Sequence, residues 1–143
     1  MFRVSWVLGL LLIAGCAQLP PSPQEIEAKR FEPAPGKSVI YLVRDDPDFS
    51  DAGAPVVLDD QLMGSTYPGT FFRWVVEPGS HQIRGFAGDA GSYALRTGPN
   101  SLYFVQQRVS RFLPTPSAQS YFQLVPEGHG RAAVMRSVLA GGQ

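Results

Sequence analysis

The stretch FFRWVVEPGSHQIRGFA, residues 71–87, carries the alternation that decides the fold class. Large apolar side chains occupy alternate positions in its first half, which is typical of a strand with one buried face, namely Phe72, Trp74 and Val76. Glu77-Pro78-Gly79-Ser80 then predicts a type II turn, because proline presets the first central position and glycine supplies the positive φ of the second. Residues 81–87 are expected to form the return strand.

Similar short runs rich in β-branched and aromatic residues lie on both sides of this stretch. The expected strands cover residues 38–44, 55–59, 62–66, 71–77, 81–87, 92–98, 102–110 and 120–126. In the last segment, 130–142, apolar residues recur at i, i+4, which predicts a helix that stops at Gly141 and Gly142. The sequence therefore predicts a mainly β domain: an antiparallel β-sandwich or partly open barrel of about seven to eight strands with one C-terminal helix.

The N-terminus has the organisation of a secretory signal peptide. Arg3 supplies a positive charge, residues 4–13 are mostly apolar, and small residues lead into Cys16, the only cysteine of the chain. The apolar run is shorter than the roughly 20 residues that a membrane-spanning helix needs. Ile13-Ala14-Gly15-Cys16 resembles a bacterial lipobox, so residues 1–15 are predicted to be a lipoprotein signal peptide and Cys16 the lipidated residue. Ordinary cleavage after Ala17, with Cys16 discarded, is the alternative.

The lipobox implies a location. Because no Asp follows Cys16, we expect attachment through N-terminal acyl chains to the outer membrane, with the domain facing the periplasm. Residues 16–35 are expected to be the lipidated cysteine and a solvated tether, since residues 17–35 contain five prolines in 19 positions. The piece EIEAKRF within this tether is too short to stand alone as a helix. Residues 36–143 are the expected β-rich periplasmic domain.

Residues 55–88 resemble the PEGA-type repeat of bacterial surface proteins. That repeat has a V-x-(L/V)-D-G hairpin, a downstream L-x-G and a V-x-P-G-x-H-x-(I/V) turn, and the matching positions are Val57, Leu58, Asp59, Leu62, Gly64, Val76, Pro78, Gly79, His81 and Ile83. With the preceding GKSVIYLVR and the lipobox, the chain also resembles an uncharacterised bacterial lipoprotein family, a domain of unknown function, over residues 36–111. Neither family has a settled activity, so the resemblance implies fold and location alone.

The same residues define the expected structural turns, namely Asp59, Asp60, Gly64, Pro78, Gly79 and His81. A tight turn is expected at Asp59-Asp60-Gln61 between two strands. The chain departs from the family at Asp60, where the family usually has Gly. Because Asp tolerates positive φ less well than Gly, we expect a hairpin turn of another type there.

Composition and missing motifs exclude several function classes. Lys+Arg number 12 and Asp+Glu number 12, and no basic stripe is present, which argues against nucleic acid as a partner. No phosphate-binding glycine loop and no dinucleotide fingerprint occurs, so no cofactor is predicted.

Two groups of residues raise the question of a metal. Residues 45–51 hold four carboxylates in seven positions, which suggests calcium, but the loop lacks the glycine and the closing glutamate of an EF-hand. An acidic surface loop is the expected alternative. Zinc needs about four ligands, and besides Cys16 the chain has only His81 and His129 with scattered acids. We therefore predict no metal site and assign His81 to its turn.

Catalysis is not predicted. Ser80 is adjacent to His81, but neighbouring strand residues point to opposite faces, and no Gly-x-Ser-x-Gly motif occurs. Six aromatic residues at strand spacing could line a sugar or lipid pocket, although core positions are expected for most: Trp74, Tyr93, Tyr103, Phe104, Tyr121 and Phe122.

Two classes of function remain open. The first is a lipid-anchored, non-enzymatic binding or scaffolding module of the cell envelope, whose partner is an envelope protein or peptidoglycan. The alternative is a periplasmic small-ligand-binding or hydrolytic domain with an unrecognised pocket. A closed aromatic cavity with convergent polar groups would favour the second class. A filled core with an exposed apolar patch or strand edge would favour the first.

Overall fold

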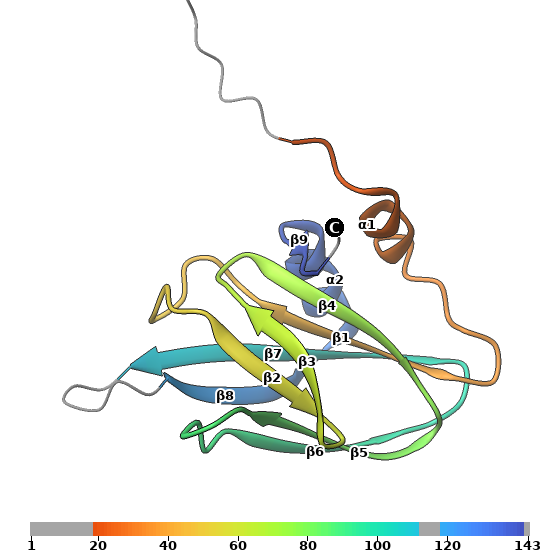
Figure 1. The fold of residues 1–143 in the computed structure, drawn as a ribbon. Coiled ribbons are helices and arrows are strands. Elements are labelled where there is room, and N and C mark those ends of the chain that lie inside the picture. Colours follow the sequence, from red (N-terminus) through yellow and green to blue (C-terminus); the bar gives the residue numbers. More distant parts are fainter. Residues whose placement is uncertain (1–18, 112–117, 142–143) are drawn as a thin grey trace, which may run out of the picture.

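The structure, a computed structural model, describes residues 19–111 and 118–141 as a β-sandwich (Figure 1). One sheet has five strands in the order β8-β7-β1-β4-β9, and the other has four in the order β3-β2-β5-β6. The strands are β1 Ser38–Arg44, β2 Ala54–Leu58, β3 Gln61–Thr66, β4 Thr70–Val76, β5 Gly79–Gly85, β6 Ser92–Thr97, β7 Ser101–Arg111, β8 Ala118–Val125 and β9 Val138–Leu139. Two helices accompany them, α1 Pro23–Ala28 and α2 Glu127–Met135. The predicted mainly β sandwich is confirmed.

Strand β1 lies at the centre of the five-stranded sheet. It pairs antiparallel with β4 and parallel with β7, and every one of its residues is buried. Ile40 and Leu42 face the second sheet, while Val39, Tyr41 and Val43 face the opposite way. Burial on both faces explains why its sequence is a continuous run rather than an alternating pattern.

Two apolar clusters hold the layers together. The cluster between the sheets contains Ile40, Leu42, Val56, Leu58, Phe72, Trp74, Ile83, Leu95, Val105 and Phe122. The second cluster lies on the outer face of the five-stranded sheet, beneath the helices, and contains Ala28, Phe31, Val39, Tyr41, Val43, Phe71, Phe104, Ala133 and Val134. Strand β4 contributes to both clusters, because Phe72 and Trp74 point inward while Phe71 points toward the helices. The predicted alternation in this strand is confirmed.

The Pro78-Gly79 turn does not close a hairpin. Strand β4 belongs to the five-stranded sheet and β5 to the four-stranded sheet, so the turn carries the chain from one layer to the other. The prediction that residues 81–87 return alongside 71–77 is therefore wrong. Strand β5 pairs with β2 and β6 instead. The expected positive φ is present at Gly79, at 149°.

The C-terminal helix is displaced from its predicted position. It spans Glu127–Met135, and the chain then forms the short strand β9, parallel to β4. The backbone N–H of Val138 donates to the Gly69 carbonyl at 2.9 Å, and that of Ala140 donates to Phe71 at 2.8 Å. The chain leaves the helix because β4 has an unpaired edge that these donors satisfy. The i, i+4 pattern across 134–139 therefore does not mark a helix face.

The segment predicted as a solvated tether is packed on the domain from α1 onward. Ser22 caps α1 through its hydroxyl, which accepts the Glu25 N–H at 3.1 Å, and Pro23 occupies the first turn. Ala28 and Phe31 are buried in the outer cluster. The Tyr41 hydroxyl donates to the Ala28 carbonyl at 2.6 Å. The prediction of a tether through residue 35 thus requires correction, because tertiary contacts stabilise a helix that is too short to form alone.

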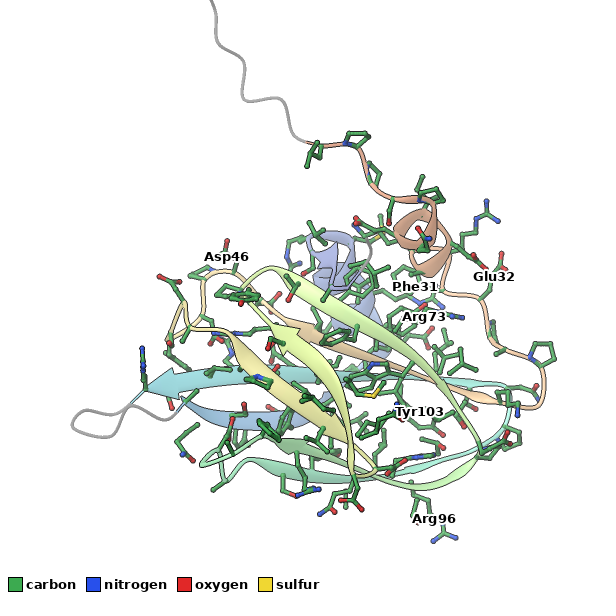
Figure 2. The ribbon with its side chains drawn as sticks, viewed as in Figure 1. Phe31, Glu32, Asp46, Arg73, Arg96 and Tyr103 are labelled. Carbon is green, nitrogen blue, oxygen red and sulfur yellow. The ribbon has the colours of Figure 1, made fainter. Side chains whose placement is uncertain are left out.

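Arg73 on β4 also holds this segment. Its Nε donates to the Tyr41 hydroxyl and its Nη2 to the Glu32 carbonyl, both at 3.3 Å. Figure 2 shows Arg73 beside Phe31 at the base of α1. Cys16 and the rest of the predicted signal peptide lie outside the described residues. In the part that the structure describes, neither helix has the length and apolar character needed to cross a bilayer.

Candidate functional site

The turn between β2 and β3 has the backbone geometry of a two-residue hairpin turn, although Asp60 stands where such turns favour Gly. Asp59 and Asp60 have φ values of 48° and 66°, so both central residues are left-handed, as a type I′ turn requires. The expectation of a different turn type at Asp60 is therefore wrong. Both aspartates also contact β5, since Asp60 pairs with Arg84 and Asp59 accepts the Gln82 N–H.

His81 joins the two turns. Its Nδ1 lies 2.5 Å from Asp59 Oδ2, and its Nε2 lies 2.7 Å from the Glu77 carbonyl oxygen. The second Asp59 oxygen accepts the Gln82 N–H at 2.9 Å. Partial burial raises the pKa of the Asp59 carboxyl, but the hydrogen bonds from His81 and Gln82 and the charge of His81 outweigh it, so that pKa lies below its ordinary value. Two of the predicted turn residues, Asp59 and His81, thus link the β2–β3 turn to the β4–β5 turn.

The contacts of His81 in this network are made with groups other than Ser80. Both ring nitrogens of His81 are engaged by oxygen atoms, whereas Ser80 is exposed on the neighbouring position of β5. A general base needs a free ring nitrogen within hydrogen-bond reach of the nucleophile. His81 is therefore engaged in the contacts of the turn and not with Ser80.

Gly64 lies where β2 and β3 contain a β-bulge. Val56 pairs with Gly64 and Val57 with Leu62, so the register shifts between them. Gly64 has a φ of 129°, and a Cβ atom there would lie 3.1 Å from Cζ of Phe72. Backbone conformation and close packing therefore both explain the glycine.

The acidic loop surrounds a buried arginine. Arg44, at the end of β1, is fully buried, and its Nε donates to Asp48 Oδ2 at 2.6 Å. Its Nη1 donates to the carbonyls of Ala52 at 2.7 Å and Thr66 at 3.1 Å, and its Nη2 donates to the Ser50 carbonyl. The loop thus encloses a guanidinium with oxygen atoms.

This arrangement answers the calcium question for two of the four carboxylates. Asp48 is committed to Arg44 and to the Val109 N–H, and Asp45 accepts Gln106 Nε2 and pairs with Arg136. Across residues 19–111 and 118–141, no group of three or more metal-ligating side chains is found. The loop is better explained as the counter-charge and wall of the arginine site.

The six aromatic residues do not form a common pocket. Trp74, Phe104 and Phe122 are buried, and Tyr93 and Tyr103 pack against the core between the sheets. Tyr121 differs, because it is 65% exposed on β8. The expectation that most of them are core residues is confirmed.

Tyr121 lines a groove of about 600 Å³ on the outer face of the β7–β8 pair. We call this the β7–β8 groove; its lining residues are Phe49, Gln106, Arg108, Ser110, Arg111, Tyr121 and Gln123. Phe49, from the acidic loop, is 76% exposed and forms one wall. The side chains of β7 and β8 project here because alternate residues of both strands face away from the sandwich core.

The groove combines aromatic surface with cationic and amide groups. The Arg108 guanidinium lies over the Phe49 ring, 5.5 Å from its centroid. Among the described residues, no hydrogen bond joins the side chains of Arg108, Tyr121 or Gln123 to a protein partner. Their donors and acceptors are therefore free to meet a ligand. Sequence reasoning identified Tyr121 but missed Phe49 and Arg108, since nothing local places a loop phenylalanine against β7.

Comparisons with known proteins give one relative. A protein of Haemophilus influenzae that is described as uncharacterized is 28% identical over 112 residues, which cover 75% of this chain and 67% of that protein. No family model and no solved structure matches the chain.

Proposed function

We propose that this protein is a lipid-anchored cell-envelope module that binds a partner without catalysing a reaction. Cys16 carries the acyl chains, the outer membrane holds them, and the β-sandwich faces the periplasm. The observation that carries the binding function is the β7–β8 groove, in which the exposed rings of Phe49 and Tyr121 flank the side chains of Arg108 and Gln123.

The groove favours a partner with apolar surface and an anionic or hydrogen-bonding group. Exposed Phe49 and Tyr121 offer ring faces of the kind that anchor interfaces. Arg108 adds a planar cation suited to a carboxylate, and Gln123 adds an amide. Carboxylate-bearing peptidoglycan and an acidic protein segment both have this chemistry. The alternative, a small-ligand-binding domain, is favoured by the size of the groove, since about 600 Å³ falls within the usual range of ligand pockets.

The anchor is tested by substitution of Cys16. Cys16→Ser should abolish incorporation of a clickable fatty acid and leave uncleaved precursor, because the thioether requires the thiol. Ser22→Ala provides a control that keeps the lipobox intact. Unchanged fatty-acid incorporation in Cys16→Ser would refute the lipid anchor.

The groove is tested by site-specific photo-crosslinking in intact cells and by sedimentation with isolated peptidoglycan. A photoreactive residue at Tyr121 should give a discrete crosslinked product, and one at Leu62 on β3, which is 54% exposed, should not. Arg108→Ala should reduce both the crosslink and the fraction that sediments with peptidoglycan, because it removes the cation of the groove. Equal yields at Tyr121 and Leu62, with no response to Arg108→Ala, would contradict the assignment of this groove.

A further inference from the structure

Four exposed apolar side chains from separate parts of the chain gather at one end of the molecule. Leu19 is 93% exposed, Ile26 on α1 49%, Met135 at the end of α2 56% and Val138 on β9 59%. All four line a single groove of about 1110 Å³ between α1 and the α2–β9 connection. We call these residues the apolar end. Scattered exposed apolar residues are ordinary, but a cluster of them marks an interaction surface.

Specific contacts fix the parts of the apolar end to one another. Glu25, almost fully buried, accepts the Lys29 ammonium at 2.6 Å through Oε1 and the Leu139 N–H at 3.2 Å through Oε2. This carboxylate therefore ties α1 to β9. Since β9 is in turn paired with β4, the apolar side chains on α1 and β9 are fixed to the rigid sheet.

The short distance along the chain from Cys16 to this surface indicates what the surface contacts. Figure 1 shows α1 and β9 at the end of the molecule where the described chain begins. Leu19 follows Cys16 by three residues, which span at most about 10 Å. An acylated Cys16 would thus hold the apolar end close to the bilayer surface, and the distance leaves little room for a protein between them.

The charges beside the apolar end suit a membrane interface. Lys29 and Arg136 line the same groove. Lys29 is paired with Glu25, and Arg136, whose side chain is 62% exposed, contacts Asp45. Long basic side chains around an apolar surface can extend toward lipid headgroups while their stems remain in contact with apolar groups.

We propose that the apolar end docks on the lipid bilayer and fixes the orientation of the domain. This inference rests on the proposed anchor at Cys16. Docking of this kind directs the opposite end of the sandwich, which carries the turn between β2 and β3, into the periplasm (Figure 1). The anchor and the docked surface together would then hold the domain in one orientation on the membrane.

The test uses the full chain, produced with its signal peptide, purified as the lipoprotein and reconstituted into vesicles of phosphatidylethanolamine and phosphatidylglycerol. Because acylation consumes the Cys16 thiol, an introduced cysteine can be labelled uniquely with an environment-sensitive fluorophore. Ile26→Cys and Val138→Cys place the label in the apolar end. Leu62→Cys is the matched control, since Leu62 is 54% exposed but lies on β3.

Quenching by lipids with a spin label near the headgroup should reduce the emission at Ile26 and Val138 at least about twofold more than at Leu62. Equal quenching at all three positions in protein that is attached to vesicles would overturn the docking and leave the anchor intact. Failure of the purified protein to attach to vesicles would overturn the anchor itself, and the docking with it. A change in the emission of the fluorophore at position 138 that follows the protein density in the vesicles, and not the quencher lipid, would show contact between copies. This result would also overturn the docking.

Discussion

The substitution Asp48→Ala tests whether the acidic loop exists to neutralise Arg44. In the folded protein the Arg44 side chain is 0% exposed and the Asp48 side chain 1%, and their Nε and Oδ2 atoms lie 2.6 Å apart. The substitution leaves Arg44 with carbonyl partners but without an anion. It also removes the acceptor of the Val109 N–H.

The expected loss is large because the charge stays buried. Removing one partner of a buried ion pair costs about 3–5 kcal/mol, and the free energy of unfolding of a domain is about 5–15 kcal/mol. For a domain of this size, such a loss corresponds to a fall in Tm of roughly 10–20 °C. Asp48→Asn keeps the side-chain volume and one acceptor oxygen, so we expect a loss of about 1–3 kcal/mol.

Urea unfolding followed by circular dichroism measures these differences. Asp51→Ala is the matched control, because Asp51 belongs to the same loop but is exposed, and its free energy of unfolding should stay within about 0.5 kcal/mol of the parent. If Asp48→Ala unfolds within about 1 kcal/mol of Asp51→Ala, the carbonyl oxygens alone satisfy Arg44 and the argument for the loop is wrong. Calcium should not raise the Tm of the parent, and a calcium-dependent increase would restore the metal-binding alternative.

Three further substitutions test the turns and the helix packing. Asp59→Asn should reduce stability at neutral pH, because the pKa of Asp59 is lowered in the folded protein. The difference in free energy of unfolding from the parent should persist above the ordinary carboxyl pKa of about 4 and vanish as the pH falls through the lowered folded pKa, which unfolding curves across that range would measure. Gly79→Val should destabilise the protein by about 1–3 kcal/mol through backbone strain alone, since no atom lies within 4 Å of the added Cβ; an unchanged Tm would contradict this. Gly130→Ala places a Cβ 2.3 Å from the Cβ of Phe104 and should lower the free energy of unfolding by about 1–3 kcal/mol. Gly128→Ala in the same helix has open space around its Cβ and should not lower it, so similar unfolding curves for the two variants would refute the packing argument.

Local pattern was sufficient for strands β1 to β8 and for the positions of their turns, but not for the turn type at Asp60 or for β9. The period-two alternation of Phe72 and Trp74 predicts a strand and its buried face, because the direction of successive side chains depends only on neighbouring residues. Gly79 was likewise predictable, since few other residues adopt its positive φ without strain. The sequence predicted Asp59 and His81 as turn residues, but the hydrogen bond between them joins turns that only the packed sheets bring together.

The tertiary structure alone decided which strands pair and what covers them. Strand β5 pairs with β2 rather than with β4, and β9 replaces the end of the predicted helix, because the unpaired backbone groups of a distant strand determine the lowest free energy there. Helix α1 exists because Phe31 and Ala28 are buried against Tyr41, a contribution that no six-residue segment contains in itself. The β7–β8 groove and the buried Arg44 site likewise depend on a loop that reaches β7 from elsewhere in the chain. The composition of that loop revealed its charge, whereas only the fold determined which group it neutralises.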